Sequence, residues 1–136
     1  MSQRVTKLYE TRHTYGEDLR VHRHERAYAS LVLHGAYEEF SVDGRFEVSG
    51  GDLVFHPPYH AHGDGFNHGE ARAFCIEFED ERLPGETVAI SLENPSAFHQ
   101  MAVKYPERAA DMVRDVLSSV RMRITPVVPV SFLCAA

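Results

Sequence analysis

Two pairs of histidines stand out in the sequence, and each pair has a single residue between its members. His22 and His24 lie in an extended segment, and His60 and His62 follow a β-rich run that ends in Pro57-Pro58. Side chains two apart on a strand share a face, so each pair can direct both imidazoles at one point. Imidazole is the commonest side-chain metal ligand, and three such nitrogens with an open position suit a divalent transition metal. The first hypothesis is therefore a metal or polar-ligand pocket inside a β-barrel.

The bulk composition is that of one ordinary globular domain. The chain has 136 residues, of which 43% are hydrophobic and 25% charged, so it can bury a core without disulfides. A net charge of −6 and the lack of a Lys/Arg-rich stripe argue against direct nucleic-acid binding. No apolar run is long enough to cross a bilayer, and the first residues lack the apolar core of a signal peptide. With two cysteines in no paired framework, we expect a cytoplasmic protein without a membrane partner.

From Val5 to about Ile90 the sequence predicts β-structure throughout. Short stretches of alternating or β-rich residues are separated by Gly, Pro and Asp. Two of the breaks, His34-Gly35 and Asp43-Gly44, are typical of hairpin turns. Strands at this spacing favour a sandwich or barrel of the jelly-roll kind.

After Leu92 the pattern predicts two helices. Asn94-Pro95 supplies a cap and a first-turn proline for a short helix, and Pro106 opens a longer one. The longer helix carries one apolar stripe, which packs either on the protein's own barrel or on a second subunit. The stripe consists of Ala109, Val113, Val116, Leu117, Val120 and Ile124.

The glycines, prolines and histidines of the β-rich region have the spacing of two known motifs. They are Gly16, His22, His24 and Gly35 for the first cupin motif, and Gly51, Pro57 and His62 for the second. The chain therefore resembles the cupin superfamily. More narrowly, residues 16 to 80 resemble the amino-terminal sensor cupin of AraC-type transcription regulators, notably His22-Arg23-His24, His56-Pro57-Pro58 and the strand that ends Cys75-Ile76-Glu77-Phe78.

The resemblance implies a mainly β fold. A single cupin jelly-roll β-barrel would occupy residues 1–92, two carboxy-terminal α-helices residues 93–124, and a tail residues 125–136. The mouth of such a barrel binds a small molecule, and His22, His24 and His62 would hold a divalent transition metal such as Zn, Fe, Mn or Ni. Without a metal, the same imidazoles would be hydrogen-bonded within a polar pocket.

Two positions depart from the cupin pattern. Tyr28 stands where metal-binding cupins usually have a glutamate, and Tyr59 stands where the second motif has a glycine. Tyr28, His56 and His60 are the expected ligand-contacting residues, with a surface position as the alternative for His60. His13 is expected to face solvent.

Two functions remain open. The first is a small-molecule-sensing domain of the type that the resemblance implies, in which an effector shifts the helices of a homodimer between two arrangements. The helix-turn-helix part of such regulators does not fit in the thirteen residues after Arg123. The alternative is a small metal-dependent enzyme of the dioxygenase or isomerase type. That alternative is weakened because Glu38, Glu39 and Glu77 are expected to be solvated strand residues and not acid or base catalysts.

Overall fold

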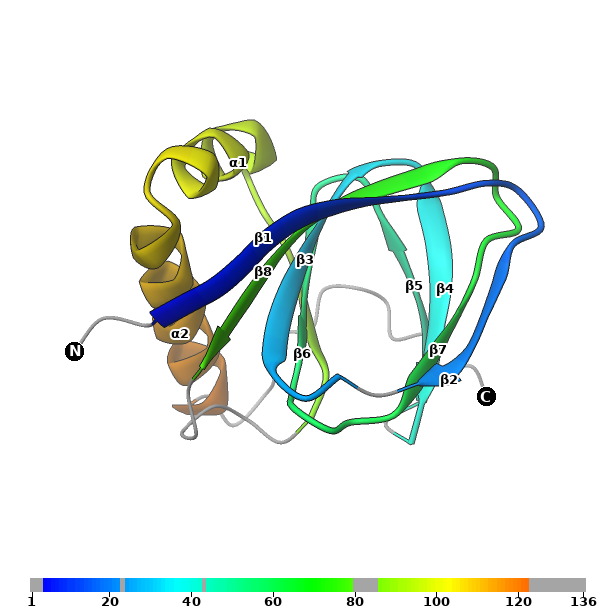
Figure 1. Ribbon diagram of the computed structural model, residues 1–136, viewed down its shortest axis with the longest axis horizontal. Coiled ribbons are helices and arrows are strands. Elements are labelled where there is room, and N and C mark those ends of the chain that lie inside the picture. Colours follow the sequence, from blue (N-terminus) through cyan, green and yellow to red (C-terminus); the bar gives the residue numbers. More distant parts are fainter. Residues whose placement is uncertain (1–3, 23, 43, 80–85, 123–136) are drawn as a thin grey trace.

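The computed structural model describes residues 4–22, 24–42, 44–79 and 86–122. Within these ranges strands come first along the chain and helices follow (Figure 1). The strands are β1 (Arg4–His13), β2 (Asp18–His22), β3 (Ala27–His34), β4 (Ala36–Ser41), β5 (Gly44–Ser49), β6 (Asp52–His56), β7 (His62–Gly65), β8 (Ala71–Glu79) and β9 (Val88–Ser91). The helices are α1 (Pro95–Lys104) and α2 (Pro106–Met122).

The strands form two antiparallel sheets that face each other. The five-stranded sheet has the order β1-β8-β3-β6-β9, and the four-stranded sheet has the order β2-β7-β4-β5. Except for β4 and β5, neighbours in each sheet come from distant parts of the chain, as in a jelly roll. The predicted mainly β jelly roll followed by two helices is confirmed, and the tail from residue 125 lies outside the described residues.

Of the two predicted hairpins, one is correct and the other is wrong. β4 and β5 pair directly up to Ser41 and Gly44, so the turn between them is a hairpin. The turn at His34-Gly35 instead carries the chain from one sheet to the other, because β3 pairs with β6 and β8 while β4 pairs with β5 and β7. Gly35 has a φ of +83°, and a Cβ at this position would collide with the carbonyl oxygen of Glu70. Glycine is therefore required by close approach of the backbone as well as by the left-handed conformation.

Both helices lie on one side of the barrel, outside the five-stranded sheet (Figure 1). The Asn94 side chain accepts a hydrogen bond from the Ala97 amide at 3.1 Å and caps α1, as predicted. The apolar stripe of α2 packs on the barrel, where Ala109, Val113 and Leu117 are buried in one core with residues of β3, β6 and β8. Ile124 and the side chain of Val120 lie outside the part of the chain that the structure describes. None of the described helices is long and apolar enough to span a membrane.

The central strands β3, β6 and β8 of the five-stranded sheet are buried on both faces, and their side chains alternate between two environments. On β3, Ala29 and Leu31 belong to the apolar core under the helices, whereas Tyr28 and Ser30 line a cavity inside the barrel. The same period of two places the apolar side chains of β8 towards the helices and Cys75 towards the cavity. This alternation positions the candidate site.

Candidate ligand and metal site

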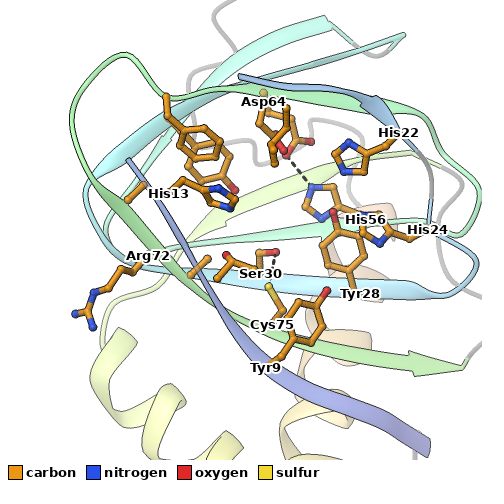
Figure 2. A pocket seen from close by; sticks show the side chains of 17 residues that line it. Tyr9, His13, His22, His24, Tyr28, Ser30, His56, Asp64, Arg72 and Cys75 are labelled. Atoms are coloured by element: carbon orange, nitrogen blue, oxygen red, sulfur yellow. Dashed lines mark hydrogen bonds and ion pairs between the residues drawn. The ribbon is translucent and has the colours of Figure 1, made fainter. Parts of the chain in front are cut away.

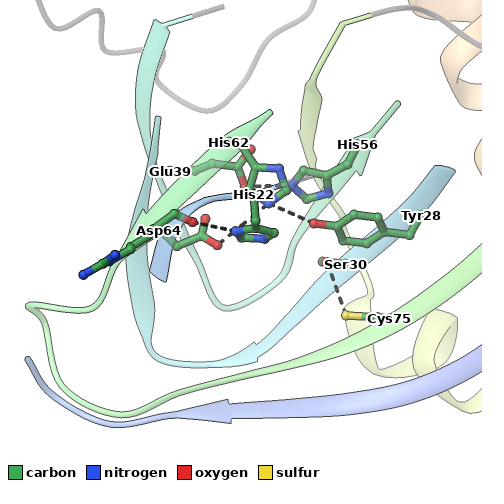
Figure 3. A network of polar contacts seen from close by, with 9 residues as sticks. His22, Tyr28, Ser30, Glu39, His56, His62, Asp64 and Cys75 are labelled. Atoms are coloured by element: carbon green, nitrogen blue, oxygen red, sulfur yellow. Dashed lines mark hydrogen bonds and ion pairs between the residues drawn. The ribbon is translucent and has the colours of Figure 1, made fainter. Parts of the chain in front are cut away.

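Pairing between strands assembles the site from residues far apart in sequence. Three cross-strand pairs meet in the barrel interior: His22 with His62, Tyr28 with His56, and Glu39 with Asp64. Directly opposite residues in an antiparallel ladder have Cβ atoms about 4.5–5.5 Å apart, so each pair is in contact. Figure 3 shows these side chains gathered between the two sheets.

His22, His24 and His62 are brought together as the two histidine motifs suggested. One ring nitrogen from each of the three lies within 4.8 Å of the others. The His22 ring lies 4.4 Å from the His62 ring and 5.0 Å from the His24 ring, between centroids. His22 Nδ1 is held by the carbonyl oxygen of Arg20 at 2.7 Å, which fixes the orientation of that ring.

Burial lowers the pKa of two of these imidazoles, His24 and His62. Burial lowers the pKa of His62 to about 2, with further lowering by His56, His22 and His24. Burial followed by the charge of His22 also lowers the pKa of His24. A neutral imidazole has a free lone pair, which is the form that binds a metal.

Glu39 and His56 form a second group beneath the first. The Nε2 of His56 donates a hydrogen bond to Glu39 Oε1 at 2.7 Å, and the two residues are 2% and 0% exposed. Burial first, then the charges of His60 and His22, lower the pKa of His56 to about 3. The expectation that Glu39 is a solvated strand residue is therefore wrong. The signal available was the alternation of β4, which puts Glu39 on the same face as the buried Tyr37.

Tyr28 contacts both histidine groups. Its hydroxyl is hydrogen-bonded to His62 Nε2 at 3.0 Å, and its ring is stacked on His56 with the centroids 4.2 Å apart. Burial and the charge of Glu39 hold the pKa of the phenol well above its usual range. At the place where a metal-binding cupin has a carboxylate, this chain therefore has a neutral hydroxyl that already contacts one predicted metal ligand.

Asp64 is a buried carboxyl group that the sequence reasoning missed. It is 7% exposed, its Oδ1 makes no hydrogen bond, and its Oδ2 lies 3.9 Å from His62 Nε2. Burial and the charge of Glu39 raise its pKa to about 8. Its position two residues after His62 on β7 was the available signal, because such residues share a face.

His22, His24, His56 and Asp64 lie together at one end of a partly open cavity of about 160 Å³ (Figure 2). The remaining wall is mostly aromatic and small, and includes Tyr9, Leu19, Tyr37, Phe66, Ala71 and Ala73. Arg72 is the one lysine or arginine among the described lining residues, and its guanidinium points away from the histidines (Figure 2). The cavity thus offers a polar end and an apolar end to a small ligand.

His13 and His56 line the cavity, whereas His60 does not. His13 does not simply face solvent: it lines the cavity, stacks on Phe66 with centroids 4.3 Å apart, and pairs with Glu17 at 2.6 Å. The expected ligand contact His56 lines the cavity as well. His60 is half-buried and is not among the residues that line the cavity.

The loop between β6 and β7 holds the second histidine motif against the first. The Tyr59 amide donates a hydrogen bond to the His24 carbonyl oxygen at 2.7 Å. Tyr59 has a φ of +61°, so it adopts the left-handed conformation that the glycine of the cupin motif adopts without strain. The substitution retains the loop geometry at a conformational cost.

The donor set of the three-histidine group fits a divalent transition metal. Three imidazoles converge from two strands and a loop, and the carboxyl group of Asp64, whose Oδ1 makes no hydrogen bond, lies beside His62. A bound metal would supply Lewis acidity or an anchor for a ligand oxygen or nitrogen. The Tyr28 hydroxyl is already bonded to His62 Nε2, so coordination at that nitrogen would displace this hydrogen bond.

The family comparison matches most of the chain. Residues 8–125 match the family described as "AraC-like ligand binding domain". No curated protein sequence matches the chain significantly.

Solved structures with the same fold are distant in sequence. ToxT from Vibrio cholerae has a TM-score of 0.65 at 4% identity, covering 88% of this chain and 57% of ToxT. AerE from Microcystis aeruginosa has a TM-score of 0.57 at 18% identity, with coverage of 65% and 46%. The DMSP lyase DddQ from Ruegeria pomeroyi DSS-3 has a TM-score of 0.51 at 21% identity, with coverage of 65% and 43%. This chain therefore spans about half the length of these proteins, and at such identities the likeness is one of fold.

Proposed function

Because the chain belongs to the AraC-like ligand binding domain family, we propose that it senses a small molecule bound in the barrel cavity. The effector enters between the sheets and contacts Tyr28 and His56, and His60 acts through its charge, which lowers the pKa of His56. Binding favours one arrangement of α1 and α2 over another. Couplings of this kind are typically about 1–3 kcal/mol.

The observation that carries this proposal is the cavity itself. A volume of about 160 Å³ admits a small molecule, and its aromatic and histidine-rich ends require a ligand with both an apolar and a polar part. A small aromatic compound with a carboxylate, hydroxyl or amino group meets both requirements. Tyr37 and Phe66, whose rings lie 5.1 Å apart, would pack against the ring of such a ligand.

The proposal includes a divalent transition metal at His22, His24 and His62, with Zn, Fe, Mn and Ni as candidates. The support is the convergence of three nitrogens within 4.8 Å and the lowered pKa values of His24 and His62. His24→Ala should abolish metal content while the β-barrel remains folded. Metal analysis of protein purified without an affinity tag tests this, and full occupancy in the variant would refute the ligand assignment.

A thermal-shift screen tests the sensing function. Small aromatic, sugar and amino-acid compounds are added to the wild type and to Ala73→Leu, which fills part of the cavity. A compound that binds the native state raises the melting temperature by mass action, by the equivalent of about 2.7 kcal/mol at one hundred times its Kd. The shift should disappear in Ala73→Leu and persist in Ala97→Leu, an exposed position on α1. A shift that both variants retain would place the binding elsewhere.

The homodimer and the cytoplasmic location are also parts of the proposal. Since the stripe of α2 packs on the barrel, a subunit contact would use the outward helix face, where Val103, Tyr105 and Met112 are exposed. Light scattering should give a dimer for the wild type and a monomer for the double variant Val103→Asp, Met112→Asp. A wild type that is monomeric at high concentration would refute the dimer.

A metal-dependent enzyme is the second candidate. The burial of Glu39 and Asp64 beside His56 and His62 favours it, because buried acid–base groups at a cavity are typical of catalytic sites. Stoichiometric iron together with oxygen uptake would support an enzyme. Stabilisation by an organic ligand that is recovered unchanged would support the sensor.

A further inference from the structure

The structure contains a second group of possible metal ligands, deeper than the three histidines. Glu39, His56 and His62 each offer one ligand atom, and these atoms lie within 4.8 Å of one another. All three residues are buried, with 0%, 2% and 1% exposure. They come from β4, β6 and β7, so the group joins the two sheets across the barrel interior.

We propose that Glu39, His56 and His62 form an inner position for a divalent cation, distinct from the outer position at His22, His24 and His62. Two imidazoles and one carboxylate with open positions form the ligand set typical of non-haem iron sites. The carboxylate that is missing at Tyr28 is then supplied by β4 of the opposite sheet.

Distances within the group support this position. The Glu39 Oε1 and His56 Nε2 atoms are 2.7 Å apart. Two ligands at right angles, each about 2.0–2.2 Å from a metal, are about 2.8–3.1 Å apart, so a small outward movement of either side chain admits an ion. The rings of His56 and His62 have their centroids 4.6 Å apart, which is compatible with both reaching the same ion.

Asp64 gives a second, independent observation. Its Oδ1 is a buried carboxyl oxygen without a hydrogen bond, although the side chain lies across the ladder from Glu39 and beside His62. Buried polar atoms normally have a partner. A cation at the inner position would supply charge compensation for this oxygen.

The two positions should differ in preference. Both use His62, so we expect one ion per chain. Imidazole ligands suit Zn, Ni and Cu, whereas a carboxylate favours Mn(II) and Fe(II). We therefore expect the inner position to bind Mn(II) and Fe(II) in preference to Zn, Ni and Cu. It does not depend on the sensing function, because a cavity can bind an organic effector with or without this ion.

The test uses Co(II), whose visible absorption reports its ligands, added to the metal-free full chain. The double variant His22→Ala, His24→Ala removes two of the three outer ligands. We expect it to retain one Co(II) per chain with altered absorption bands. Adding Glu39→Gln should then weaken Co(II) binding by more than about 100-fold, since loss of even an outer-sphere partner costs about 10–100-fold. The matched control is Glu38→Gln, the neighbouring residue on β4, which is paired with Arg45 on the outside of the barrel and should change nothing.

Failure of the inner position is distinguishable from failure of the outer one. If the wild type binds Co(II) and the double variant does not, the inner position is refuted and the outer one stands. Unchanged binding after Glu39→Gln also refutes it. Circular dichroism checks that each variant is folded, and should the Glu39 variant unfold, His56→Gln in the double variant replaces it. Retained Co(II) in that folded variant would equally overturn the proposal, while the effector screen on the wild type is unaffected.

Discussion

Both faces of the central strands β3, β6 and β8 are buried, but the two faces carry different side chains. The face under the helices packs Leu31, Phe55, Ile76 and Phe78 into a continuous apolar core. The face inside the barrel carries Tyr28, Ser30, His56 and Cys75 and borders the cavity. Residues of the two kinds alternate along the same strands, so neighbouring residues on one strand point to opposite faces.

The helix-facing side of the sheet stabilises the fold, whereas the cavity-facing side carries the groups that could bind a ligand. Apolar burial stabilises in proportion to the area removed from water, so the helix-facing side contributes most of the stability. The cavity-facing side buries imidazoles and carboxyls, which costs free energy unless a partner or a ligand compensates. Substitutions on the two faces should therefore affect different measurements.

Adjacent residues on β8 provide the sharpest test of this separation. Ile76 faces the helices and Cys75 faces the cavity, and both are buried. Ile76→Ala should lower the free energy of unfolding by about 2–5 kcal/mol and leave ligand binding unchanged. Cys75→Ala should cost less than about 1.5 kcal/mol in urea unfolding and should alter ligand-induced stabilisation. Equal losses of stability for the two variants would contradict the separation.

The pH dependence of the metal-free protein should come from the cavity side. The pKa of His56 falls from 6.5 to about 3 and that of His62 to about 2, so these rings stay neutral in the folded state. Below pH 6.5 they bind protons only in the unfolded chain, and stability falls as the pH falls. The pKa of Asp64 rises from 3.8 to about 8, so its contribution has the opposite sign and is lost as the pH rises towards 8.

Below pH 6.5 the two histidines change the stability with pH by more than the one carboxyl group, and in the opposite direction. Stability should therefore decrease by about 1.4 kcal/mol per pH unit on the acid side and reach its maximum near pH 6.5. Urea unfolding between pH 4.5 and 8 measures this. Asp64→Asn should remove the decline above pH 6.5 and steepen the acid-side slope to about 2.7 kcal/mol per pH unit, because the opposing contribution of Asp64 is then absent on both sides. A stability that is constant over the whole range would show that these groups do not titrate as described.

The smallest expected effect concerns the loop between the two sheets. Tyr59 has a φ of +61° and is 66% exposed, so its side chain gives little packing in return for the strained conformation. Tyr59→Gly should raise the free energy of unfolding by about 1 kcal/mol, because a left-handed non-glycine residue costs about 1–2 kcal/mol. Thermal unfolding measures the change. A loss of stability would mean that the tyrosine ring makes a compensating contact.

The sequence predicted those parts of the molecule that depend on local patterns. The strands, the two helices and the cap at Asn94 follow from periodicity and turn residues. His22, His24 and His62 could be singled out because each pair of motif histidines shares a face and the glycines and prolines around them have a recognisable spacing.

The remaining features depend on which strands meet. The turn at His34-Gly35 has the composition of a hairpin, and only the pairing of β3 and β4 with other strands shows that it connects two sheets. Glu39 and Asp64 look like ordinary polar strand residues, and their burial follows from the β4–β7 ladder that places them opposite each other. Such long-range pairing is not encoded in a local pattern.

The main-chain hydrogen bond from the Tyr59 amide to the His24 carbonyl joins the segments that carry the two histidine motifs. Neither segment can move away from the other without exposing this amide to solvent. Its deuterium uptake therefore measures the opening of the histidine cluster at a single backbone position. Slower uptake after addition of a metal or an effector would report directly that the cluster has closed.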